Sequence, residues 1–183
     1  MKITILFSLL LSNCFAAFFS TGTFVPYFNK EQVSENGSKK VFQLNPYFGY
    51  GTNIHLSGKT YFLPEIAYSY LTNSEDSVRQ EIVFLNYHFS YYNSPNIILK
   101  YGLSTYWWRI AGQGGTKRLR NGDGYTNFRL PDETRTSYIT SLMGGFESFF
   151  KQDQSFRFDL YIMDSINSDS RSYHYFLGVN FYL

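Results

Sequence analysis

The chain has 183 residues, the length of one domain, and its 44% hydrophobic and 16% charged residues exclude an intrinsically disordered chain. Its formal net charge is only +2 and no basic stripe alternates with aromatic residues, which excludes nucleic-acid binding. The aromatic fraction of 21% is high for a mean hydropathy of -0.25. Membrane β-barrels combine these properties, because only alternate residues face lipid and aromatic rings gather at both interfaces.

The first residues predict an export signal. Lys2 supplies a minimal positive region, residues 3–11 form a short apolar run, and Cys14–Ala16 offers small residues for cleavage. Polar residues interrupt the apolar run after about ten residues, short of the roughly 20 that a membrane-spanning helix needs. We therefore expect residues 1–16 to be a signal peptide and residues 17–183 to form the mature domain.

Cys14 is the only cysteine, which excludes an intrachain disulfide and a cysteine metal cluster. The sequence Leu11-Ser12-Asn13-Cys14 loosely resembles a lipoprotein cleavage box, in which the cysteine is lipidated. Asn13 departs from the usual small residue at that position. Lipidation of Cys14 is therefore an alternative, as a second membrane signal.

After the export signal, apolar and polar residues alternate with period two, and no stretch keeps the helical spacing. The last strand is the clearest case, because one of its faces is apolar and the other is polar or small. Seven turn-rich breaks separate eight such strands: residues 29–39, 57–59, 72–77, 93–96, 112–134, 152–155 and 167–170. The sequence therefore predicts an all-β fold, an eight-stranded antiparallel up-and-down transmembrane β-barrel.

The lengths of the breaks favour a membrane. An even number of strands places both chain ends on one side, and if that side is periplasmic the three inner turns are short and the longest loop faces outward. The strands are also longer than the about 5 or 6 residues usual in soluble sheets. The alternative is a secreted β-sandwich or a lipocalin-like barrel with its apolar face inside. Eight strands, however, cannot enclose so many rings.

The end of the chain carries a family resemblance. The sequence from Gly178 to Leu183 resembles the terminal assembly signal of outer-membrane proteins, with Gly178 ahead of Phe181 and Leu183. Phe176 stands where a polar residue is usual, and Leu183 where a final aromatic residue is commonest. The resemblance implies recognition by the barrel-assembly machinery. Together with the strand count, the mature chain resembles the small OmpA- and OmpX-type barrel families, which implies a location in the bacterial outer membrane.

Five charged residues fall on the predicted inner face. They come from four strands and carry both signs: Glu65, Lys100, Glu147, Arg157 and Asp159. In a barrel of eight strands, side chains nearly fill the lumen, so buried charges must be paired or hydrated. We expect one internal ion-pair network that plugs the lumen, with a gated polar pathway as the alternative.

The three histidines raise the question of catalysis. His88 and Ser90, like His55 and Ser57, share the His-x-Ser spacing of outer-membrane lipid A deacylases. Both pairs fall beside predicted periplasmic turns, whereas those enzymes act near the outer leaflet. The histidines also lack metal-ligand spacing. We predict no catalytic residues, no metal and no cofactor.

The longest break, residues 112–134, contains a basic patch formed by Lys117, Arg118 and Arg120. Its glycines match neither a phosphate-binding loop nor a calcium loop. A basic outer loop would lie beside lipopolysaccharide phosphates, which arginine pairs with bidentately. We expect this loop to contact lipopolysaccharide or an external ligand, although a merely mobile loop is an equal alternative.

These observations predict a non-enzymatic outer-membrane protein with a structural or surface-interaction role. A lipid A-modifying hydrolase and a narrow pore are the alternatives. The first strand is the least determined element, because either Phe24 or Val25 would face lipid. Pro26 is a difficulty there, since proline is tolerated at strand edges and bulges and a closed barrel has no edge.

Overall fold

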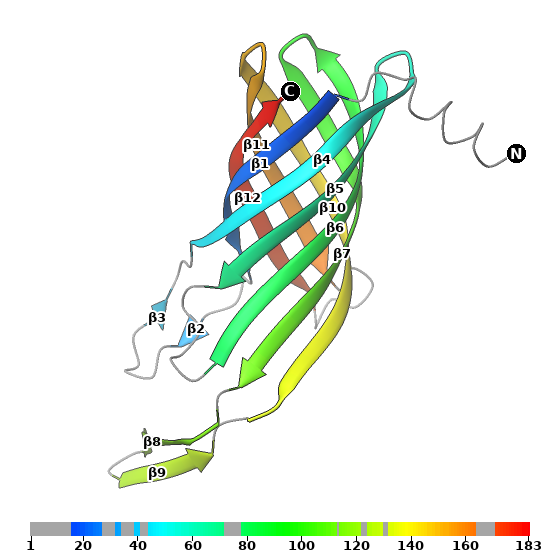
Figure 1. Cartoon of the computed structure of the whole chain (residues 1–183). Helices are drawn as coiled ribbons and strands as arrows, with labels where there is room; N and C mark the ends of the chain where they lie inside the picture. Colours follow the sequence, from blue (N-terminus) through cyan, green and yellow to red (C-terminus); the bar gives the residue numbers. More distant parts are fainter. Residues whose placement is uncertain are drawn as a thin grey trace, which may run out of the picture.

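The computed structural model describes residues 16–26, 32–33, 39–40, 44–71, 78–112, 114–121, 124–129, 132–163 and 171–183. Eight long strands form a closed barrel: β1 (Ala16–Val25), β4 (Asn45–Ser57), β5 (Thr60–Leu71), β6 (Val78–Ser94), β7 (Ile97–Gly112), β10 (Thr134–Lys151), β11 (Gln154–Met163) and β12 (Ser172–Tyr182). Each strand pairs antiparallel with its neighbours along the chain, and β1 pairs with β12 to close the ring (Figure 1). The predicted fold class is confirmed.

The connections are short at one end of the barrel and long at the other. Two-residue turns join β4 to β5, β6 to β7 and β10 to β11, as the sequence predicted. Gly58 in the first turn has φ +53°, a backbone conformation that glycine adopts without steric cost. The backbone amide of Leu183 donates to the carbonyl oxygen of Ala17 (2.9 Å), so β1 begins and β12 ends beside these turns. We call this the short-turn end and the opposite one the long-loop end.

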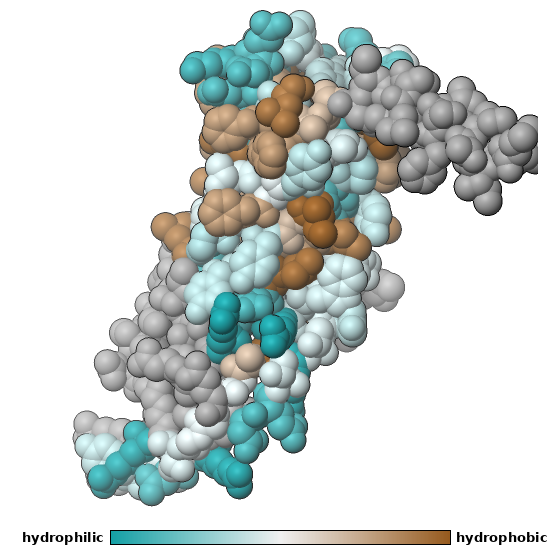
Figure 2. Space-filling model, in the orientation of Figure 1, coloured by the Kyte–Doolittle hydropathy of each residue, from teal (hydrophilic) through white to brown (hydrophobic). Residues whose placement is uncertain are grey.

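Alternation decides which side chains face inward. In β12, Ser172, His174 and Asn180 are buried in the lumen, while Leu177 and Phe181 point outward. Buried and more exposed residues alternate in the same way along much of β4, β7 and β11. The apolar face is therefore outside, which rules out the alternative of a barrel or sandwich with that face in its interior. Figure 2 shows hydrophobic residues over the middle of the wall, with hydrophilic residues at both ends.

The longest break is not a plain loop. It contains the hairpin of β8 (Thr116–Asn121) and β9 (Gly124–Arg129), which projects beyond the barrel at the long-loop end (Figure 1). Gly114 and Gly115 precede it with φ +69° and +102°, values that favour glycine. A second small pair, β2 (Gln32–Val33) and β3 (Lys39–Lys40), overlaps the predicted break at residues 29–39. The sequence prediction missed both pairs, because their strands are short. Among the described residues there is no helix with the length and apolarity that a bilayer crossing requires.

The structure of β1 settles the facing of Phe24 and Val25 and the place of Pro26. Phe24 belongs to the buried core of the lumen. Val25, the next residue, is also buried, so neither of the two side chains that could have faced lipid is exposed. Pro26 follows the end of β1 at Val25 and takes no place in the ladder, which removes the expected difficulty. Pro64 does lie within β5. The β4–β5 register runs to Gly51↔Glu65 and resumes at Ile54↔Phe62, so the ladder is interrupted where proline lacks an N–H.

The seam between β1 and β12 depends on a cross-strand pair of glycines, Gly22 and Gly178. A Cβ added at Gly22 would lie 2.2 Å from the carbonyl oxygen of Leu177 and 2.5 Å from the Cα of Gly178. Backbone atoms cannot yield to such contacts without separating the two strands. Gly144, on the outer face of β10, has nothing within 4 Å of an added Cβ.

We predict that Gly22→Val destabilises the barrel by about 1–3 kcal/mol or more, because overpacking at the seam forces backbone shifts. The matched control, Gly144→Val, is expected to unfold at the wild-type urea concentration. Urea titration of the refolded proteins measures both. Equal midpoints for the two variants would contradict close packing at the seam.

Candidate functional site

The lumen is divided into two halves of different chemistry. Toward the long-loop end its core is apolar and aromatic and includes Phe24, Phe84, Tyr106, Trp108 and Phe176. The ring centroids of Phe24 and Phe84 are 5.0 Å apart in an edge-to-face arrangement, which aromatic pairs prefer. Toward the short-turn end, the lumen contains the charged residues. We call the first half the aromatic plug and the second the charge network.

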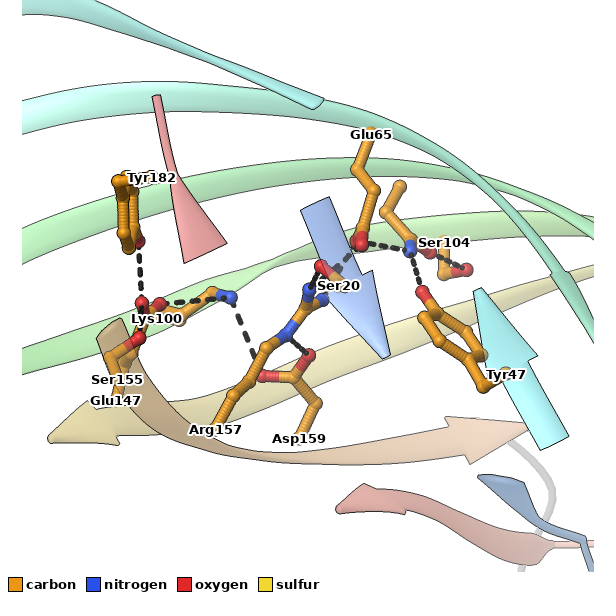
Figure 3. Close-up of polar contacts among 11 residues, drawn as sticks. Ser20, Tyr47, Glu65, Lys100, Ser104, Glu147, Ser155, Arg157, Asp159 and Tyr182 are labelled. Atoms are coloured by element: carbon orange, nitrogen blue, oxygen red, sulfur yellow. Dashed lines mark hydrogen bonds and ion pairs between the residues drawn. The ribbon is translucent and has the colours of Figure 1, made fainter. Parts of the chain in front are cut away.

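Arg157 on β11 is the centre of the charge network. Its Nη1 and Nη2 donate to the two carboxylate oxygens of Glu65 on β5 at 2.8 Å each, a bidentate pair. Its Nε donates to Asp159 at 2.6 Å, and Nη1 also donates to Ser20 Oγ on β1 at 2.9 Å. Strands β5 and β11 lie on opposite sides of the ring, with three strands between them in either direction. The guanidinium therefore bridges the whole width of the lumen (Figure 3).

Lys100 on β7 extends the network toward the short-turn end. Its Nζ lies 3.6 Å from Glu147 Oε2 and 3.8 Å from Asp159 Oδ1. Lys100 therefore connects Asp159, a partner of Arg157, to the carboxylate of Glu147. Glu147 Oε1 also accepts hydrogen bonds from Ser155 Oγ and from the Tyr182 hydroxyl. At the other side of Arg157, Asn86 Nδ2 donates to Glu65 Oε2 (2.8 Å). The contacts form one continuous line from Tyr182 to Glu65 (Figure 3).

All five predicted inner charges thus lie together, and each is buried. Alternation along the strands was enough to assign them to the lumen, since positions i, i+2 and i+4 of a regular strand face the same side. The three carboxylates and two cations leave a formal charge of 2 − 3 = −1. Charges in a low-dielectric interior are tolerated only when they are paired, as they are here.

Sequence reasoning missed the neutral partners and the aromatic plug. Ser20, Asn86 and Ser104 have no sequence signal beyond an inward position, because hydrogen-bond partners from distant strands depend on register. Ser104 Oγ donates to Asn86 Oδ1, and Asn86 also donates to the Tyr47 hydroxyl at 3.0 Å. The rings at inward positions were a usable signal. Phe176, which departs from the assembly-signal pattern, lies 5.0 Å from the Arg157 guanidinium and stacks a cation against its ring.

The two His-x-Ser pairs occupy different places in the structure. His88 and Ser90 are fully buried in the lumen. His55 is exposed beside the first short turn, where its Nε2 lies 3.1 Å from the Gly58 carbonyl oxygen. Among the described residues, no three His, Cys, Asp or Glu side chains lie close enough to hold a metal ion.

The predicted basic patch lies on β8 of the projecting hairpin. The Arg118 guanidinium stacks over the Tyr125 ring at 4.4 Å, and Arg129 pairs with Asp132 at 3.3 Å. The side chains of Lys117 and Arg120 lie outside the described part of the structure. Within the predicted assembly signal, Gly178 packs at the seam and Phe181 faces outward, while Leu183 follows β12.

Comparison with known proteins places the fold. No family model matches the chain, and no curated protein matches it in sequence. The structure is similar to Ail, the attachment invasion locus protein of Yersinia pestis, with TM-score 0.51 and 8% identity over 92% of this chain and 97% of that one. Ail in complex with the heparin analogue sucrose octasulfate gives TM-score 0.50 and 10% identity over 92% and 97%. Neisserial surface protein A gives 0.51 and 6% over 92% and 96%.

At these identities the likeness concerns the fold alone. The chain has the fold of the eight-stranded outer-membrane β-barrels, as the resemblance in the sequence indicated.

We predict that Arg157→Met destabilises the protein by about 3–5 kcal/mol, because it leaves Glu65 and Asp159 buried without their cation. Arg109→Met is the matched control, since Arg109 is 56% exposed and its 3.6 Å pair with Glu81 is a surface pair. Such pairs contribute about 0–1 kcal/mol. Urea unfolding of the refolded variants compares them. Similar losses in both would mean that the charge network does not hold the barrel together.

Proposed function

Because the chain has the fold of eight-stranded outer-membrane barrels, we propose that it is an integral protein of the bacterial outer membrane. Its role is structural or one of surface contact, and not enzymatic. It would be exported through the signal peptide of residues 1–16, and the barrel-assembly machinery would recognise Gly178, Phe181 and Leu183. The observation that carries the proposal is the exposed apolar wall of the closed barrel.

Large apolar side chains cover the outside of the barrel. Phe48 is 60% exposed, Tyr101 55% and Ile66 53%, and many others on the same wall are similarly open: Phe19, Leu99, Leu103, Leu142, Phe146, Leu177 and Phe181. Soluble monomers rarely expose contiguous apolar patches of more than a few hundred Å². A lipid bilayer satisfies such a wall, and the closed ring leaves no unpaired strand edge in it.

The interior argues for a plugged barrel instead of a narrow pore. The aromatic plug occupies the long-loop half of the lumen, and Arg157 of the charge network bridges the full width beside it. An ion would have to separate paired buried charges and then cross an apolar segment. Both steps are costly, so a conducting pathway is the weaker alternative.

The hydrolase alternative also lacks support. A deacylase needs its histidine and serine in reach of a lipid ester, whereas His88 and Ser90 face the lumen and are fully buried. A catalytic base must lie within hydrogen-bond reach of its substrate in a plausible pose. The wall of the barrel separates this pair from the bilayer.

The β8–β9 hairpin is the proposed contact site. It carries Lys117, Arg118 and Arg120 on one strand and projects from the long-loop end, which would face the exterior (Figure 1). Lipopolysaccharide phosphates are the partner that this charge favours, and an external anionic ligand is a second one. The complex of Ail with a polysulfated sugar shows that a barrel of this fold can bind a polyanion.

We predict that the protein is recovered in the outer-membrane fraction and migrates differently in SDS gels before and after boiling, because a closed membrane barrel stays folded until heated. Mass spectrometry of that material is expected to give Ala17 as the first residue, or a lipidated Cys14 in the alternative. A soluble periplasmic protein without a heat-dependent shift would contradict the proposal.

We predict that replacing Lys117, Arg118 and Arg120 by Gln weakens lipopolysaccharide binding and reduces its salt dependence, since three cations near phosphate are removed. The control replaces Lys59, an exposed cation at the short-turn end, by Gln. Binding of the refolded proteins to immobilised lipopolysaccharide measures the difference. Unchanged affinity in the hairpin variant would exclude the lipid contact while leaving the membrane location intact.

A further inference from the structure

An open cavity of about 560 Å³ lies at the short-turn end of the barrel. It is formed by residues that are far apart in sequence and meet at the mouth of the lumen, among them Asn53, Tyr92, Phe149, Lys151 and Tyr182. The proposed role in surface contact does not use it, and the charge network reaches its wall through Tyr182. Its volume falls within the range of small-molecule sites, which are about 300–1,000 Å³.

Aromatic rings from three strands line this cavity. Phe149 at the end of β10 and Tyr182 at the end of β12 have ring centroids 5.3 Å apart. Tyr92 of β6 completes the set, and its own ring is held 4.9 Å from that of Tyr61. The faces of such rings carry negative charge density, and groups of them bind organic cations.

A buried negative charge lies directly behind the rings. The Tyr182 hydroxyl, which belongs to the cavity wall, donates to Glu147 Oε1 (Figure 3). Glu147 shares Lys100 with Asp159, and the network as a whole carries the excess carboxylate counted above. The floor of the cavity is therefore both aromatic and negative, a combination that favours an ammonium group over a neutral or anionic one.

The cavity is open on one side only. Behind Glu147 the paired charges span the lumen, and beyond them lies the aromatic plug. A ligand that enters from the short-turn end meets a closed floor, which suits binding and not passage. The rim carries the exposed cation of Lys151, which would repel a simple cation but would pair with an acidic group on a zwitterion.

We propose that this cavity binds a small zwitterion, with its ammonium group against Tyr92, Phe149 and Tyr182 above Glu147 and its phosphate at Lys151. A choline phosphate or ethanolamine phosphate group has this chemistry, either free or as the headgroup of a phospholipid. The inference requires the barrel fold and does not depend on the contact role of the hairpin.

Isothermal titration of the refolded full chain in a maltoside detergent tests the proposal, since phosphocholine detergents would themselves occupy the site. The probes are phosphocholine, choline and 3,3-dimethylbutanol, the neutral isostere of choline. We expect phosphocholine to bind most tightly and choline to bind about tenfold more tightly than the isostere, because a cation in a partly desolvated ring site gains on that order. Equal affinity for choline and the isostere would overturn the proposal.

Three variants assign the contacts. Tyr92→Leu and Glu147→Gln should each weaken choline binding, whereas Lys151→Gln should weaken only the preference for phosphocholine over choline. Tyr138→Leu is the control, since that ring is 73% exposed at the opposite end. The heat-dependent gel shift verifies that each variant folds. If Glu147→Gln does not fold, Tyr92→Leu still decides, because it alters only the cavity wall, and wild-type choline binding in Tyr92→Leu would refute the site.

Titrations in lipid bilayers distinguish a free zwitterion from a phospholipid headgroup as the occupant. The same titration with phosphocholine is repeated in nanodiscs of phosphatidylcholine and in nanodiscs of phosphatidylglycerol. Binding suppressed only in phosphatidylcholine would support a headgroup as the occupant. Equal binding in both would support a free zwitterion, and binding in neither nanodisc would overturn the site in the membrane-embedded protein.

Discussion

The bridge from Arg157 to Glu65 is the interaction on which the interior depends. It connects β11 to β5, which face each other across the ring, and the same guanidinium also contacts Ser20 of β1 and Asp159. Neighbouring strands are held by their ladders, but opposite walls of a barrel share no backbone hydrogen bonds. A buried bidentate pair supplies a cross-lumen connection with fixed geometry. Lys100 joins the network through Asp159, and Glu147 joins it through Lys100.

That bridge also explains the division of the lumen. Glu65 and Asp159 are paired with Arg157, and the remaining buried charges of the network, Glu147 and Lys100, lie at the short-turn end. On the other side, Phe176 covers the guanidinium and begins the aromatic plug. Rings there pack against one another, and Trp108 Nε1 also donates to Gln80 Oε1 at 3.2 Å. Arg157 joins the two halves, because the edge of its guanidinium group pairs with carboxylates and its face lies against the Phe176 ring.

Period-two alternation carried most of what the sequence could predict. It assigned the two faces of β12 and placed Glu65, Lys100, Glu147, Arg157 and Asp159 inside, because the alternation of side chains along a strand is a local property. Which charges touch is set by strand stagger, which no single strand encodes. The hairpin of β8 and β9 was missed because six-residue strands rich in charge resemble loop. Pro26 was misjudged for a related reason, since the exact end of a strand is a matter of one or two residues.

The difference between the two ends of the barrel explains why the charge network lies toward the short-turn end. Buried charges cost least where their surroundings stay close to water, and the mouth at the short-turn end provides that access through the cavity beside Tyr182. Had the network been placed at the other end, its excess carboxylate would lie next to a hairpin rich in arginine and be drawn toward it. With the plug between them, the negative interior and the basic hairpin are separated by apolar rings. The two proposed partners, an anion at the hairpin and a zwitterion at the short-turn cavity, would therefore meet charge sets that do not neutralise each other.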